Sequence, residues 1–94
     1  MRNLETYHHN FLEAGTHTFE LKANPKYELL IKNLTSKKIV LSYGTEIDTT
    51  KEPYVEMIPN TAEIIPYKSN GNNPVKITVT AEGTGTVEIR VLDD

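Results

Sequence analysis

Histidine is the residue type in this sequence with the most direct route to metal chemistry, and it occurs at positions 8, 9 and 17. Neighbouring residues of a β-strand point to opposite faces, so His8 and His9 cannot chelate one ion from a single strand. A metal site would need further ligands from Glu5, Glu13 or a second subunit, and a threefold axis that gathers three copies of His8 or His9 is the version worth testing. We therefore predict no metal site and interpret His8, His9 and His17 as surface or interface residues.

Carboxylates and serines are the other groups that could support catalysis. Four acidic residues lie in or beside a polar stretch at residues 45–53: Glu46, Asp48, Glu52 and Glu56. Carboxylate pairs act as general acid and base when a pocket shifts the pKa of one of them, whereas a polar loop leaves both solvated. The serines are few and none lies in a nucleophile-elbow motif: Ser36, Ser42 and Ser69. These patterns predict a protein that is not an enzyme and holds no cofactor.

A glycine pair near the C-terminus invites comparison with phosphate-binding loops. The segment Gly83-Thr84-Gly85 lacks the last glycine of the GxGxxG pattern and the lysine of a phosphate-binding loop. A tight turn explains it, and Gly83 and Gly85 are the predicted turn residues. Gly85 can adopt a left-handed conformation at no steric cost, so its replacement by valine should be destabilising.

Five tyrosines outnumber the two phenylalanines. A tyrosine has a large apolar face and a polar tip, which suits sugar stacking or a wet interface, but the same property suits the rim of a thin sandwich. The candidate interaction residues combine these aromatic rings with the N-terminal histidines: Tyr7, His8, His9, Phe11, Tyr43, Tyr54 and Tyr67.

Composition limits the remaining possibilities. A chain of 94 residues forms one domain, and the absence of cysteine excludes disulfides, thiol catalysis and cysteine-bound zinc. A net charge of -3 argues against nucleic acid as the main partner. No apolar run is long enough to predict a membrane helix, and the N-terminus lacks the apolar segment of a signal peptide. The Asn-Leu-Thr triplet at residues 33–35 is therefore interpreted as a chance match to a glycosylation site.

The elements that position these residues are predicted to be strands. Thr, Val and Ile account for 26 of the 94 residues, and these types favour β-sheet. Alternation and turn signals predict seven strands, at residues 17–22, 27–34, 39–43, 54–58, 62–67, 75–82 and 87–91. The last two are predicted to pair as a hairpin with Thr80 opposite Glu88. Residues 27–34 include three consecutive aliphatic residues, Leu29, Leu30 and Ile31, and predict a central strand covered on both faces or packed at a sandwich end. Pro66 suggests an edge or a strand end.

The fold class that follows is all-β, a small antiparallel sandwich of about seven or eight strands, immunoglobulin-like or jelly-roll-like. Residues 16–94 are predicted to form the single sandwich domain. Residues 1–15 are predicted to be an N-terminal arm or an extra edge strand, with Gly15 at the junction.

Three segments resemble a family of short proteins encoded in the structural modules of tailed bacteriophages. The first is the strand and turn at residues 19–25 (FELKANP), and the second is the strand pair at residues 29–34 (LLIKNL) and 39–44 (IVLSYG). The third is the proline turn at residues 58–63 (IPNTAE) before the two final VxIxV strands. The resemblance extends over residues 16–92, and Asn60 stands where the proline turn usually has glycine.

The resemblance implies a β-sandwich that decorates a capsid, joins head to tail, or serves as a tail, fibre or baseplate part. We expect a non-enzymatic virion component that assembles with itself and with other virion proteins through β-edges and the N-terminal arm. Its location would be the virion, and the host cytoplasm during assembly. Deleting residues 1–14 should then weaken self-association. The alternative is a carbohydrate- or surface-binding module that uses Tyr43, Tyr54 or Tyr67 as a platform for a glycan. Neither interpretation predicts a nucleic-acid or membrane partner.

Overall fold

The computed structural model describes residues 2–22, 28–43, 54–66 and 75–93. This part of the chain contains eight strands and no helix. The strands are β1 (Arg2–Phe11), β2 (Gly15–Leu21), β3 (Glu28–Thr35), β4 (Ile39–Tyr43), β5 (Tyr54–Met57), β6 (Thr61–Pro66), β7 (Val75–Ala81) and β8 (Gly85–Asp93). The seven strands predicted from residue 17 onward are all present, and β1 is the eighth. No helix long and apolar enough to cross a membrane occurs among the described residues.

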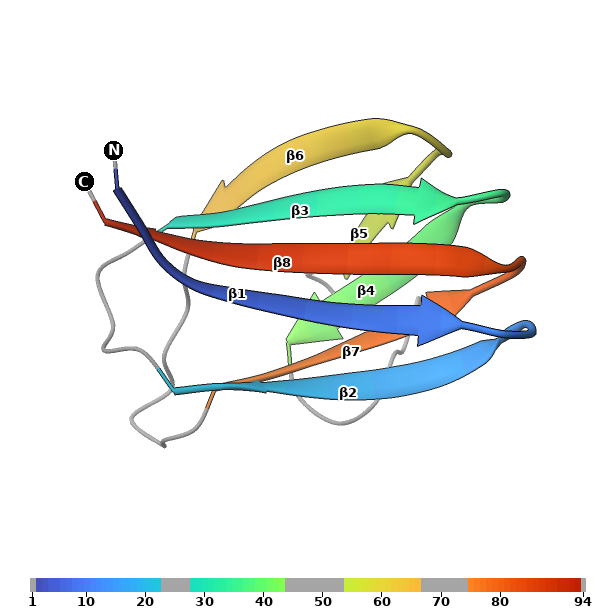
Figure 1. Ribbon diagram of the computed structural model, residues 1–94, viewed down its shortest axis with the longest axis horizontal. Helices are drawn as coiled ribbons and strands as arrows, with labels where there is room; N and C mark the ends of the chain where they lie inside the picture. The colour runs from blue at the N-terminus through green and yellow to red at the C-terminus, as the bar shows by residue number, and fades with distance from the viewer. Residues whose placement is uncertain (1, 23–27, 44–53, 67–74, 94) are drawn as a thin grey trace.

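The strands form two antiparallel sheets with a nested order of partners. The first sheet has the order β1-β8-β3-β6 and the second has the order β2-β7-β4-β5. The first strand pairs with the last, the second with the seventh, the third with the sixth and the fourth with the fifth. Two further pairings, β3 with β8 and β4 with β7, join these strand pairs into sheets (Figure 1). An antiparallel sandwich of eight strands with this order is a jelly roll. It is not immunoglobulin-like, because there the first two strands share a sheet.

The predicted hairpin between residues 75–82 and 87–91 is wrong. Strands β7 and β8 lie in different sheets, and residues 82–84 cross from one sheet to the other. Thr80 lies opposite Thr16 and Val40, while Glu88 lies opposite His8 and Lys32. Alternation identifies the face of a strand that meets the core, and this is correct for both strands, but it does not identify the neighbouring strand.

The core lies between the two sheets and consists of inward-facing side chains at alternate positions. Its members are Phe11, Phe19, Leu21, Leu29, Ile31, Ile39, Leu41, Met57, Ile65, Val75, Ile77, Val79, Ala81, Val87, Ile89 and Val91. Strand β3 is central in its sheet, as predicted, but its outer face is not covered, because Leu34 remains 52% exposed. Strand β6 is an edge strand that ends at Pro66, as the proline indicates.

The two ends of the sandwich differ (Figure 1). The short connections after β1, β3, β5 and β7 lie together at one end, and both chain termini lie at the other. Gly85 begins β8 at the end with the short connections and has a φ of 129°. A Cβ atom there would lie 2.7 Å from the carbonyl oxygen of Leu34 and 2.7 Å from the Cα atom of Thr35. The conformational requirement for glycine at this position is thus confirmed, although the turn is not a hairpin.

Candidate functional site

An ion-pair cluster lies on the outer face of the first sheet and is built by three neighbouring strands. His8, Glu88 and Lys32 occupy one row across β1, β8 and β3, and Arg90 lies two residues further along β8. The Glu88 carboxylate is 2.9 Å from Nε2 of His8, 3.0 Å from Nε of Arg90 and 3.4 Å from Nζ of Lys32. This pattern of cross-strand pairs favours the observed register of the sheet.

The cluster also determines what Glu88 can do chemically. Its side chain is only 9% exposed. Burial alone would raise the pKa of the Glu88 carboxyl, but hydrogen bonds from Arg90, His8 and Lys32 outweigh burial and hold that pKa below its ordinary value. A carboxylate held ionised and already bonded to three partners is a poor general base, and these ion pairs join three neighbouring strands.

Beside the cluster, the outer face of β3 and β6 carries four aliphatic side chains, and Lys32 lies between two of them on β3. Leu30 of β3 lies opposite Ile64 of β6, and Ala62 lies one position further along on the same face. Ile64 and Leu34 are each 52% exposed. We call these four residues, Leu30, Leu34, Ala62 and Ile64, the aliphatic strip. Two of its residues belong to β6, whose other backbone edge has no strand partner in the described part of the chain.

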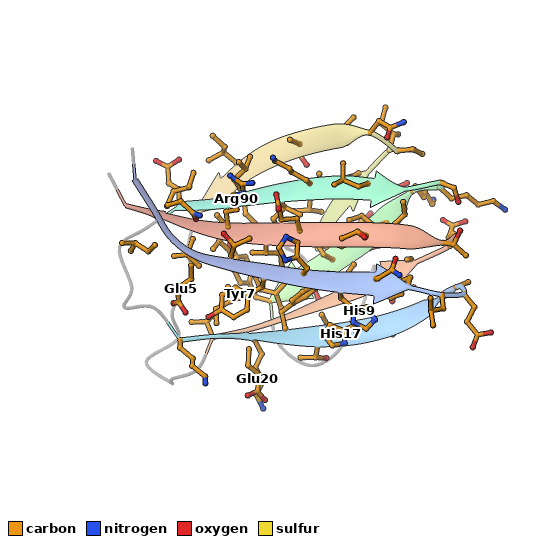
Figure 2. All side chains as sticks on the ribbon, viewed as in Figure 1. Glu5, Tyr7, His9, His17, Glu20 and Arg90 are labelled. Atoms are coloured by element: carbon orange, nitrogen blue, oxygen red, sulfur yellow. The ribbon has the colours of Figure 1, made fainter. Side chains whose placement is uncertain are left out.

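A row of rings fills the opposite edge of the sandwich, between β1 and β2 (Figure 2). His9 of β1 stacks on His17 of β2 with ring centroids 3.7 Å apart and planes 9° from parallel. Phe11 meets His9 edge-on at 4.6 Å, and Phe19 meets His17 edge-on at 4.8 Å. Burial, followed by the nearby charge of protonated His9, lowers the pKa of His17.

Tyr7 continues this row toward the chain termini. Its hydroxyl donates a hydrogen bond to the Glu5 carboxylate and accepts one from the backbone N–H of Lys22 at 3.2 Å. The ring packs against the core. Tyr7 therefore joins β1 of the first sheet to the end of β2 in the second.

The prediction that His8 and His9 point to opposite faces is confirmed. His8 contacts Glu88 on the outer face of the first sheet, and His9 points to the inner face, where it stacks on His17. No group of three or more potential metal ligands occurs in the residues that the structure describes.

The other candidate residues are dispersed. Tyr43 packs against the core, and burial raises its pKa to about 12. Tyr54 lies on the outer face of β5 and is 36% exposed. Glu56 pairs with Lys38 at 2.9 Å on the solvent side. Several predicted positions lie outside the described residues: Glu46, Asp48, Glu52, Tyr67 and Ser69.

A buried polar cluster at the end with the short connections was not predicted from the sequence. Asn33 is fully buried, and its Nδ2 donates to the carbonyl oxygens of Lys37 and Met57, both at 3.0 Å. Its Oδ1 accepts from the N–H of Thr35 at 3.0 Å and from the Thr35 hydroxyl at 2.6 Å. Because Asn33 belongs to one sheet and Met57 to the other, the cluster ties the two sheets together. The asparagine of the Asn-Leu-Thr triplet is thus enclosed in the fold.

Comparison with known proteins adds no relative. No protein-family model matches the chain, and no curated protein or solved structure matches it either. The resemblance to bacteriophage structural proteins therefore depends on the sequence pattern alone.

Proposed function

We propose that this protein is a non-enzymatic structural component of a bacteriophage particle, which assembles with copies of itself and with other virion proteins. The observation that carries the proposal is the aliphatic strip on β3 and the edge strand β6. Side chains as large as Leu34 and Ile64 are exposed there on the outer face of the sheet, where association with another protein would remove them from water. The jelly-roll order supports the proposal by analogy, because viral capsid domains use it.

Of the two alternatives predicted for the N-terminal segment, an arm or an extra edge strand, the structure has the edge strand. Arg2–Phe11 is paired along its length with β8, and Phe11 is buried in the core. Deletion of residues 1–14 would therefore remove a strand of the first sheet and disturb the fold itself. Loss of assembly after such a deletion would not identify an interface, so surface substitutions are the appropriate test.

The experiment measures absolute mass by light scattering over a concentration series. We expect the native chain to form a discrete oligomer, and the variants Leu34→Lys and Ile64→Lys to shift it toward monomer. Thr6→Lys is the matched control, since Thr6 is exposed on the outer face of the same sheet but lies on β1. Oligomers that persist in both strip variants would show that the interface does not include the aliphatic strip. A native chain that is monomeric at every concentration would overturn self-assembly.

A glycan platform receives less support from the geometry. Two coplanar, exposed tyrosines would be needed for stacking on adjacent sugar rings. Among the described residues, Tyr54 is exposed, whereas Tyr7 and Tyr43 pack against the core.

A further inference from the structure

The stacked histidines lie at a place where the sandwich is closed mainly by side chains. Strands β1 and β2 are the edge strands of different sheets and form no ladder with each other. The contact between them depends on the row of rings, with the His9–His17 stack at its centre (Figure 2). Phe11 and Phe19 lie against the stack and are buried beside it. Repulsion between the two imidazoles would therefore weaken the contact between β1 and β2.

The surroundings of the stack offer no countercharge among the described residues. The residue opposite His9 on β8 is Val87, and the residue opposite His17 on β7 is Val79. The charged groups of β1, β2 and the turn between them do not face the stack. Glu5 bonds to Tyr7, and His8 bonds to Glu88 on the outer face of the first sheet. Glu13 is exposed in the turn, and Glu20 is exposed on the outer face of β2. A proton added to either ring would therefore lack a neighbouring carboxylate.

The protonation state of the pair decides whether this contact is attractive. Two neutral imidazoles stack as aromatic rings. Two imidazolium ions with centroids 3.7 Å apart would repel strongly in a partly buried site. The lowered pKa of His17 agrees with this geometry, because the folded state favours the neutral ring. Folding is then most stable above the ordinary histidine pKa of about 6.5, and stability is lost as the pH falls through that value toward the lower pKa of the folded state.

We propose that the His9–His17 stack is an acid-sensitive latch between the two sheets. With both rings neutral the latch closes the edge between β1 and β2. Protonation opens this edge and exposes Phe11 and Phe19 to solvent. The latch is independent of the proposed assembly role, because it requires only the folded monomer.

The test compares urea unfolding of the native chain at about pH 7.5 and about pH 5 with that of His17→Phe, which retains a ring but cannot be protonated. The folding equilibrium constant of the native chain should fall at the lower pH, by up to about tenfold for each unit by which the fold lowers the histidine pKa. His17→Phe should lose most of this difference. The control Glu20→Gln, at an exposed position on the outer face of the strand that carries His17, should retain it. Equal stability of the native chain at the two pH values would overturn the latch, as would an unchanged difference in His17→Phe.

A second measurement uses the native chain alone and so does not depend on how the variants fold. Proton NMR titration follows the imidazole ring of His17, and hydrogen exchange follows the amides of β1 and β2. We expect His17 to titrate below about 6.5 and amide exchange in these two strands to accelerate over the same pH interval. Titration of His17 at or above its ordinary value, or exchange that does not change with its protonation, would refute the proposal.

Discussion

Replacing Asn33 by leucine tests whether the buried polar cluster holds the two sheets together. The change removes four hydrogen bonds, which join the Asn33 amide to Lys37, Met57 and Thr35. The Thr35 hydroxyl is 2.7 Å from the carbonyl oxygen of Lys37, so these two groups can satisfy each other after the substitution. The Met57 carbonyl and the Thr35 N–H lose the partner that Asn33 provided.

The size of the effect follows from these two groups. A buried polar group without a partner costs about 1–3 kcal/mol, so two such groups cost about 2–6 kcal/mol, and the greater hydrophobicity of leucine offsets part of this. We expect a net loss of about 3 kcal/mol from a domain whose total stability is of the order of 5–14 kcal/mol. At about 4–8 °C per kcal/mol, the Tm should fall by about 12–24 °C.

The assay is urea unfolding followed by circular dichroism, supported by thermal unfolding. Asn10→Leu is the matched control, because Asn10 is exposed on β1 and its side chain makes one long hydrogen bond, with Thr86 at 3.4 Å. We expect the control to change stability by less than about 0.5 kcal/mol. If Asn33→Leu were no more destabilising than Asn10→Leu, the inference that this cluster fastens the sandwich would be refuted.

Three further outcomes follow from the structure. Gly85→Val should lower the Tm more than Gly15→Ala, because a Cβ atom at Gly85 would clash with the backbone of β3. A Cβ atom at Gly15 would lie 4.0 Å from its nearest neighbour. Similar losses of Tm in the two variants would contradict this prediction. The lowered pKa of Glu88 stabilises the fold above the ordinary carboxyl pKa, and this contribution is lost as the pH falls through the lower folded value. Glu88→Gln should therefore be less stable than the native chain at neutral pH, and the gap should narrow in acid; a gap that did not depend on pH would exclude the ion pairs as its source. Alkaline titration followed by tyrosinate absorbance should show a group that ionises near pH 12 in the native chain and is missing in Tyr43→Phe. An identical titration of the two proteins would contradict the burial of that ring.

The sequence predicted the strands and their inward faces more completely than their partners. Each strand alternates because one of its faces meets the core, and this signal is local. One partner of β8 is β1, more than seventy residues away in the chain, and alternation within a strand does not identify so distant a partner. A three-residue connection such as 82–84 can serve either as a hairpin loop or as a crossing between sheets, so its glycines did not distinguish the two.

The stacked histidines could have been found from residue parity. His17 lies two positions before the apolar Phe19, so the two residues share a face of β2. Likewise, Phe11 and His9 share a face of β1. The contact between the two strands was not predictable, because it depends on which edge strands meet across the sandwich. Asn33 was not identified for another reason: its strand has three consecutive aliphatic residues followed by Lys32 and Asn33, so alternation does not show which of these two polar residues faces the core.

The nested order of the jelly roll has a consequence for how the chain reaches its native state. Because β1 pairs with β8, the earliest strand to leave the ribosome has no partner in the first sheet until the latest one has been synthesised. The backbone edge of β1 that pairs with β8 therefore stays unpaired until β8 has been synthesised. Contacts so distant in sequence also make the search for the native pairing slow. A nascent or slowly refolding chain consequently passes through a period in which unpaired strands can join those of other copies, and chaperone capacity or low temperature should raise the soluble yield.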